Sequence, residues 1–303
     1  MSKKALLIDA DSTIPNLALM KISTYLKSQG YETGFNIDDP DVVYASVIFD
    51  RNKHKTDGLE FLYPDAHIDR GGSAISLTKV LPDEIEYCMP DYSLYPDCDY
   101  DMGFTTRGCI RNCYFCIVPK KEGKFRIVQH PREFHDPNHK KVMILDNNVL
   151  ANKEWFMEIT DYFIENNLKV SFNQGLDIRL MDKDIAERLV KLKPYEGWRI
   201  AFDDIKSKEA VIKGIKLLHA AGMHTRSKLI CYVYVNSNED FDNALERCQI
   251  LRDLDTCPYV MLNQNVKWDG IVKTLRRWTL PYVFFQLTWD EWLNHRKKLG
   301  KVY

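Results

Sequence analysis

Short apolar segments alternate with segments of helical periodicity over residues 1–80. Ala5–Ile8 and Val42–Phe49 are apolar runs of the kind found in strands that are buried within a parallel sheet. A helical pattern lies between them, beginning at Pro15 and ending near Gly30, and a further strand is expected around His67. Strands that alternate with helices predict an α/β domain built on a parallel sheet.

The alternation becomes more regular after residue 100. The strands predicted there are Gly103–Thr106, Lys141–Leu145, Val170–Asn173, Trp198–Phe202, Leu229–Val235 and Tyr259–Leu262. Helical patterns between them begin at the capping residues Asn152, Asp182 and Ser207, and their apolar residues recur every three or four positions. Six strands with intervening helices predict an open, partial β/α barrel, because a full barrel needs eight such units. In these folds the chemistry takes place at the carboxyl ends of the strands.

Prolines, tyrosines and acidic residues interrupt the alternation between residues 81 and 100. Pro82, Pro90 and Pro96 make this stretch an irregular connector, so we place a domain boundary there. The predicted parts are an α/β domain over residues 1–95, the partial barrel over 96–263, and a basic, aromatic helical cover over 264–303.

The composition is that of an ordinary globular protein, with 303 residues, 45% hydrophobic and 28% charged. It excludes a disordered tail, a collagen and a small disulfide-stapled scaffold. Residues 1–100 carry 17 acidic and 9 basic side chains, whereas the remainder carries 26 and 33, which favours two units with different roles. The first apolar run ends at Asp9 and is too short for a signal peptide, and Val42–Phe49 is too short to span a bilayer. We therefore expect a soluble, cytoplasmic protein without a membrane partner.

Three of the eight cysteines are clustered on one predicted loop. Cys109, Cys113 and Cys116 have the spacing C-x3-C-x2-C and follow the first predicted barrel strand. Three thiolates on one loop can ligate three irons of a [4Fe–4S] cluster, leaving the fourth iron open to a substrate or cosubstrate. A structural zinc site is the alternative, because zinc accepts three cysteines and one histidine or four cysteines. Candidates for its fourth ligand are Cys98, His130 and His135.

The segment Thr105–Cys116 resembles the signature of the radical S-adenosylmethionine (SAM) superfamily, C-x3-C-x-aromatic-C, with Phe115 at the aromatic position. The resemblance covers about residues 100–262. It implies that Cys109, Cys113 and Cys116 ligate the cluster and that SAM chelates the open iron through its amino and carboxylate groups. One electron from the reduced cluster would then cleave SAM, and the 5′-deoxyadenosyl radical would abstract hydrogen from a substrate that the sequence does not identify.

The resemblance also implies SAM contacts at polar residues that follow successive strands. Phe115 would lie against the adenine, and Asp146 and Asn148 stand where relatives carry a Gly-Gly-Glu or an acidic equivalent near the SAM amino group, although the glycines are missing here. The remaining candidates are Gln174, Asp177 and Arg179 after the third strand and Asp203 after the fourth. Helix capping and loop solvation are the alternative roles for each of these side chains.

The N-terminal residues Asp9–Met20, together with Gly71-Gly72, resemble the cobalamin-binding domains of one radical SAM branch, which implies a Rossmann-like parallel sheet. The Asp-x-His-x-x-Gly motif that ligates cobalamin is absent, so we interpret this domain as a degenerate relative and cobalamin as the less favoured cofactor. A cobalamin-dependent radical methylase is the alternative function. A non-catalytic module that binds metal or nucleic acid is the second alternative.

Basic residues flank the cysteine loop and recur in the tail. Lys120, Lys121, Lys124 and Arg126 form either a solvated face or a basic rim for an anionic substrate or an acidic electron donor such as flavodoxin or ferredoxin. Residues 264–303 interleave basic and aromatic side chains, which favours a helical cover of the barrel over a nucleic-acid-binding surface.

Overall fold

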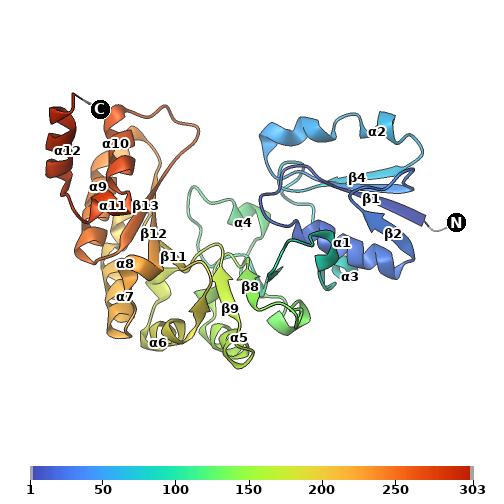
Figure 1. Cartoon of the computed structure of the whole chain (residues 1–303), viewed down its shortest axis with the longest axis horizontal. Helices are drawn as coiled ribbons and strands as arrows, with labels where there is room; N and C mark the ends of the chain where they lie inside the picture. The colour runs from blue at the N-terminus through green and yellow to red at the C-terminus, as the bar shows by residue number, and fades with distance from the viewer. Residues whose placement is uncertain (1–2, 301–303) are drawn as a thin grey trace. The chain divides into compact units, whose positions relative to one another are not determined.

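The computed structural model describes residues 3–300, and in this part of the chain it shows an α/β protein whose strands pair mostly in parallel (Figure 1). The chain divides into two compact units, Met1–Asp146 and Asn147–Tyr303. The division falls within the predicted part 96–263, and the predicted boundaries after residues 95 and 263 stay a prediction. The α/β class is confirmed. No helix within residues 3–300 has the length and apolar character needed to cross a bilayer.

A four-stranded parallel sheet forms the centre of the N-terminal part of the first unit, with the strand order β2-β1-β3-β4. Its strands are β1 (Lys3–Asp9), β2 (Tyr31–Gly34), β3 (Val42–Ser46) and β4 (His67–Gly71). The strands expected at Ala5–Ile8 and around His67 are confirmed, and the one expected at Val42–Phe49 is confirmed as far as Ser46, where β3 ends. Strand β2 was not predicted, because Tyr-Glu-Thr-Gly lacks an apolar run and lies at the edge of the sheet.

Helices cover both faces of this sheet, as a parallel sheet requires (Figure 1). Helix α1 (Leu17–Ser28) begins after Asn16, whose side chain accepts a hydrogen bond from the Leu19 backbone N–H. Leu19, Ile22 and Leu26 of α1 pack with Ala5, Leu7 and Ile85 of the short helix α3 (Asp83–Glu86). On the other face, Leu59 of α2 (Leu59–Leu62) packs with Leu6, Val43 and Ala45.

The remainder of the first unit carries the cysteine loop between two short strand pairs. Strands β5 (Asp101–Gly103) and β8 (Lys141–Ile144) pair in parallel. Strands β6 (Thr106–Arg107) and β7 (Arg126–Ile127) pair antiparallel and enclose the short helix α4 (Val118–Lys121). The single strand expected over Gly103–Thr106 is therefore divided between the end of β5 and the start of β6.

The second unit contains parallel strands joined by amphipathic helices. Strands β11, β12 and β13 form one sheet, β9 pairs with β10, and a bridge between Leu176 and Ile200 joins the segment after β9 to β11. The strands are β9 (Lys169–Phe172), β10 (Lys193–Pro194), β11 (Trp198–Ala201), β12 (Leu229–Val235) and β13 (Cys257–Leu262). The helices are α5 (Lys153–Glu165), α6 (Lys183–Lys191), α7 (Lys208–Ala220), α8 (Thr225–Lys228), α9 (Phe241–Asp253), α10 (Gly270–Trp278), α11 (Pro281–Phe284) and α12 (Trp289–Lys298).

Two of the three predicted helix caps in this unit are confirmed. The side chain of Asn152 accepts from the Trp155 N–H at 2.8 Å, and that of Asp182 accepts from the Ile185 N–H at 2.9 Å. Ser207 stands at the cap position of α7 but does not cap it with its side chain. Its hydroxyl instead donates to the Asp204 carbonyl oxygen at 2.6 Å, so the expected side-chain cap is wrong.

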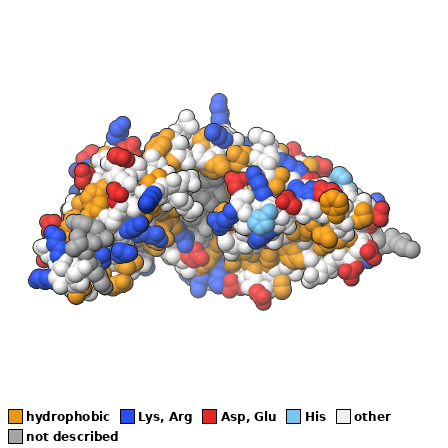
Figure 2. All heavy atoms as spheres, turned by 90° about the horizontal axis from the view of Figure 1, so that it is seen from above, with side chains coloured by type: hydrophobic (Ala, Val, Ile, Leu, Met, Phe, Trp, Pro, Cys, Tyr) orange, Lys and Arg blue, Asp and Glu red, His pale blue; other side chains and the backbone are white. Residues whose placement is uncertain are grey.

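The aromatic residues of the C-terminal helices lie largely in the interior. Trp278 contacts Phe284 and Trp289 at ring-centroid distances of 4.8 and 5.5 Å, and all three side chains are buried. The Arg252 guanidinium of α9 donates to the Phe284 carbonyl oxygen and ties α11 to the rest of the unit. Basic and acidic side chains are interspersed over the face drawn in Figure 2, so neither sign of charge covers that face.

Candidate metal centre

The cysteine loop has a closed base. Strands β6 and β7 pair at its two ends, and the Cys109 N–H donates to the Gly123 carbonyl oxygen at 3.4 Å. Gly108 has a φ of +75°, and a Cβ placed there would lie 2.2 Å from the Lys124 carbonyl oxygen. Only glycine fits this backbone conformation and this close approach of the two strands. A side chain at position 108, where the chain leaves β6, would therefore push apart the two strands at the base of the loop.

The three cysteines of the motif are reduced and half-buried on this loop. A turn is closed by the Cys116 N–H, which donates to the Cys113 carbonyl oxygen at 3.0 Å. The Arg111 N–H donates to the Cys109 sulfur at 3.3 Å, and such bonds stabilise a thiolate and tune the potential of a bound cluster. Three soft thiolate donors on one short loop suit an iron–sulfur cluster chemically. Within residues 3–300, however, no three His, Cys, Asp or Glu side chains are grouped so that they could hold a metal ion.

The candidates for a fourth zinc ligand have other partners. The Cys98 thiol donates to the Tyr100 carbonyl oxygen at 3.2 Å. The Nδ1 atom of His130 accepts from the Arg132 N–H at 3.1 Å, and His135 Nε2 lies 3.3 Å from the His139 carbonyl oxygen. These contacts hold all three side chains within their own local structure.

Apolar side chains are exposed around the three thiols. Ile110, Tyr114, Phe115 and Ile117 all project from the loop into solvent, and the rings of Tyr114 and Phe115 meet edge to face at 5.1 Å. Exposed apolar residues grouped in this way mark a surface that contacts a ligand or a partner. Contact of Phe115 with an adenine stays a prediction.

An ionic network holds the entry to the loop in place. The Arg107 guanidinium pairs with Glu86 at 2.5 Å and with Glu122 at 3.2 Å, and it lies 3.6 Å from the centroid of the Phe104 ring. Glu86 also pairs with Lys21 of α1, whose pKa is lowered by burial. Arg107, which in sequence belongs to the run of basic residues beside the motif, is thus neutralised by two carboxylates. Sequence reasoning missed this network, because Lys21 and Glu86 are distant from Arg107 along the chain.

The Asp146 side chain forms hydrogen bonds with the residues that lead into the cysteine loop. Its side chain is 3% exposed, and it accepts hydrogen bonds from the Thr105 N–H at 2.6 Å, from the Thr106 hydroxyl at 2.8 Å and from the Thr105 hydroxyl. Burial raises the pKa of this carboxyl to about 6. Both carboxylate oxygens have partners within the first unit, and the predicted contact with SAM stays a prediction.

In the second unit, the structure brings together four of the five remaining candidates. Arg179 forms a two-point ion pair with Asp177, with distances of 2.6 and 3.1 Å. The Asn148 amide donates to the same carboxylate at 3.3 Å. Asp203 accepts from the Tyr234 N–H at 2.9 Å, and burial raises its pKa while the charges of Arg247 and Arg179 oppose that shift.

Gln174 is exposed, and it differs in this from the partly or fully buried residues Asn148, Asp177 and Asp203. Asp177 also serves as a cap, because its carboxylate accepts from the Arg179 N–H. The alternative expected for these carboxylates, a structural role at a helix start, is therefore confirmed for Asp177. The second unit thus holds a polar cluster of mixed charge in which Asn148 is buried, Asp177 and Asp203 are half-buried and Arg179 is exposed.

A backbone contact of the chain itself accounts for Gly72, the second glycine of the Gly71-Gly72 pair, whereas a Cβ at Gly71 would meet no atom within 4 Å. A Cβ at Gly72 would lie 2.2 Å from the Val47 carbonyl oxygen. The neighbouring Asp11 carboxylate accepts from the Ile48 and Phe49 N–H groups at 2.8 and 2.9 Å. The close approach of the β3 end is thus sufficient to require Gly72, and the residues present give no positive fit to cobalamin.

No family model matches the chain, and no curated protein is detectably similar to it. Function is therefore inferred from the cysteine loop and the residues around it.

Proposed function

We propose that this protein is a radical SAM enzyme whose cluster ligands are Cys109, Cys113 and Cys116. The observation that carries the proposal is the loop itself, on which three reduced thiols in the C-x3-C-x2-C spacing lie between the paired strands β6 and β7. When bound there, a [4Fe–4S] cluster would supply the electron that cleaves SAM to methionine and a 5′-deoxyadenosyl radical, which abstracts hydrogen from the substrate.

Backbone groups and side chains of the loop have defined tasks under this proposal. The Arg111 N–H stabilises negative charge on the Cys109 sulfur. Ile110, Tyr114 and Ile117 place exposed apolar surface beside the thiols, which would contact a bound ligand or partner. Arg107 and Gly108 fix the direction in which the loop leaves β6.

A reducing partner is part of the proposal. Lys120, Lys121, Lys124 and Arg126 are exposed on or beside the loop and would attract an acidic electron donor such as flavodoxin or ferredoxin. The expected partial (β/α)6 barrel belongs to the proposal as well. It is supported by the parallel pairings of β5 with β8, of β9 with β10, and among β11, β12 and β13.

Product formation under anaerobic conditions tests the proposal. The full chain is reconstituted with iron and sulfide, SAM and dithionite are added, and 5′-deoxyadenosine is quantified. Cys113→Ala should lose the cluster absorbance and reduce product to background. Cys88→Ala is the matched control, because Cys88 is a half-buried cysteine of the same unit outside the motif.

Three results would contradict the proposal, the first of them from metal analysis. Binding of zinc with no uptake of iron by the wild-type chain would overturn the proposal. Equal loss of product in Cys113→Ala and Cys88→Ala would show that the motif does not act specifically. A complete four-iron cluster that gives no 5′-deoxyadenosine with any electron donor would leave a protein that keeps the cluster without this chemistry, and would also overturn the proposal.

A further inference from the structure

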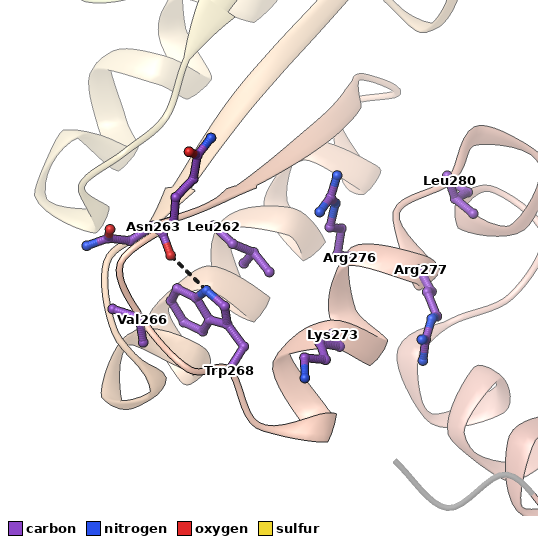
Figure 3. Close-up of a pocket in the computed structure, with 9 residues that line it drawn as sticks. Leu262, Asn263, Val266, Trp268, Lys273, Arg276, Arg277 and Leu280 are labelled. Atoms are coloured by element: carbon purple, nitrogen blue, oxygen red, sulfur yellow. Dashed lines mark hydrogen bonds between the residues drawn. The ribbon is translucent and has the colours of Figure 1, made fainter. Parts of the chain in front are cut away.

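A hollow of about 510 Å³ lies in the second unit at the carboxyl end of β13 (Figure 3). The chain that follows β13 forms one side of it and helix α10 forms the other. Its volume falls within the range of about 300–1,000 Å³ that is usual for small-molecule sites. The polar side chains that line it are Asn263, Gln264, Trp268, Lys273, Arg276 and Arg277.

Positive charge lines the hollow without a compensating carboxylate. Lys273, Arg276 and Arg277 are three and four residues apart, so they project from neighbouring positions of α10, and all three are exposed. No Asp or Glu is among the lining residues, and none of the three cations forms a salt bridge with any residue that the structure describes. An anion is the natural complement of such a group, and a phosphate suits the forked guanidinium groups of two arginines.

Trp268 supplies a fixed aromatic face in the same hollow. Its indole N–H donates to the Asn263 carbonyl oxygen at 2.9 Å, a bond that sets the orientation of the ring (Figure 3). The chain on both sides of Trp268 is held by Asn238, whose amide donates to the Lys267 carbonyl oxygen and accepts from the Asp269 N–H. The ring is half-buried, so it is held in place and still accessible. A preorganised aromatic ring beside cations is the combination that stacks a nucleobase and binds its phosphate.

We propose that this hollow binds a phosphorylated nucleoside, with the phosphate at Lys273, Arg276 and Arg277 and the base against Trp268. A free mononucleotide and one unit of a single strand present the same chemistry to these residues. The proposal does not depend on the cluster or on SAM. If the hollow bound no nucleotide, the proposed radical chemistry would be unaffected. If the radical chemistry were disproved, the proposed nucleotide site would likewise be unaffected.

Binding to the full chain tests the proposal without reconstitution. Adenosine monophosphate and inorganic phosphate are titrated by calorimetry. A fluorescein-labelled single strand of about twelve adenylates, within the ~4–16 nucleotides that such sites cover, is titrated by anisotropy. Arg276→Gln/Arg277→Gln should weaken binding at least tenfold, and Trp268→Ala about tenfold, because base stacking contributes ~1–3 kcal/mol by alanine substitution. The matched control is Lys213→Gln/Lys216→Gln, which removes two exposed charges from α7 and should change affinity less than twofold.

The results distinguish a free nucleotide from a polynucleotide as the ligand, and both from outcomes that contradict the proposal. Binding of the mononucleotide that competes with the strand supports a free nucleotide, and binding of the strand alone supports a polynucleotide. The double variant Arg276→Lys/Arg277→Lys keeps the positive charge but loses the two-point hydrogen bonding of each guanidinium group to phosphate. It should therefore bind phosphate more weakly, while an unchanged circular dichroism spectrum shows that the fold is retained. Inorganic phosphate binding as tightly as the nucleotide, with no effect of Trp268→Ala, would overturn the proposal. So would the absence of binding, or equal weakening in the Lys213→Gln/Lys216→Gln control.

Discussion

The Asp146 carboxylate accepts two hydrogen bonds from Thr105, one from its backbone N–H at 2.6 Å and one from its hydroxyl. Thr105 lies between β5 and β6, and Asp146 follows β8, so these bonds tie two strand ends together directly ahead of the cysteine loop. The Thr106 hydroxyl adds a third bond to the same carboxylate. Asp146 therefore supports the base of the candidate cluster site from within the first unit.

Asp146→Asn is predicted to change how stability depends on pH. Burial raises the pKa of Asp146 from 3.8 to about 6, so between these pH values the unfolded chain loses its proton before the folded one. The wild type should lose up to about 3 kcal/mol of unfolding free energy from this group as the pH rises from ~4 to ~6, whereas the asparagine variant should not. Urea unfolding of both proteins from pH 4 to 7 measures the difference.

Asp97→Asn is the control for this comparison, since it removes one exposed negative charge from the same unit. If the stability of the wild type relative to Asp146→Asn increased as the pH rose through this interval, the hydrogen bonds from the two threonines would outweigh the effect of burial. The sign assigned here would then be wrong.

Gly108→Ala is predicted to open the base of the cysteine loop. The new Cβ would lie 2.2 Å from the Lys124 carbonyl oxygen in a backbone with a φ of +75°, and we expect a cost of about 3 kcal/mol together with loss of iron uptake. Gly123→Ala is a matched control, because Gly123 has a φ of +73° and a Cβ added there would meet no atom within 4 Å. It should cost about 1 kcal/mol and retain iron. Iron content and urea unfolding report on the two effects, and equal losses would refute the steric argument.

Local sequence signals were sufficient for the elements that carry strong patterns. The apolar run of β12 predicted its bounds, Leu229–Val235, and Asn152 and Asp182 cap their helices because the side chain and the N–H it accepts from are three residues apart. Strand β2 has no such run, since an edge strand buries little of its surface. Ser207 satisfies the local rule for a cap, but its hydroxyl donates to Asp204.

The residues of the candidate site likewise fall into those that a local sequence pattern predicts and those that it does not. The three cysteines are recognisable because their ligand chemistry depends on spacing within a few residues. The pairing of Arg107 with Glu86 and the contact of Gly108 with Lys124 depend on chain segments that meet only after folding, so no local pattern indicates them. The tail residues were expected to cover the barrel, which stays a prediction; Trp278 is buried, whereas Trp268 lines a hollow.

Arg247→Met is predicted to be strongly destabilising. The Arg247 guanidinium is 1% exposed and donates to the carbonyl oxygens of Phe202 and Tyr234 at the ends of β11 and β12 and to Asp240 before α9. The guanidinium also donates to the Asn243 carbonyl oxygen, so its removal takes a donor from three carbonyl oxygens and a carboxylate, at a cost of about 3–5 kcal/mol. Arg226→Met removes an exposed arginine paired with Asp255 and should cost no more than about 1 kcal/mol. Thermal and urea unfolding measure both, and similar values would show that the buried contacts contribute little.

Charge reversal beside the cysteine loop should slow electron delivery by a protein donor and leave chemical reduction unchanged. Lys120 and Lys124 are exposed there, so Lys120→Glu and Lys124→Glu should each slow reduction of the cluster by flavodoxin about tenfold at low salt. Dithionite is small and needs no docking surface, so its rate should change little. The deficit should shrink as ionic strength rises above ~0.1 M, where the Debye length is about 10 Å.

Lys140→Glu is the matched variant for this experiment, because Lys140 is an exposed lysine of the same unit that lies outside the loop. Stopped-flow absorbance of the reconstituted protein gives the second-order rate constants. Equal slowing in Lys140→Glu would indicate a response to net charge and would contradict a docking site at the loop. Slowing with dithionite to the same extent would mean that the substitutions alter the cluster itself. Only a donor-specific, salt-sensitive effect at Lys120 and Lys124 assigns the basic rim to partner recognition.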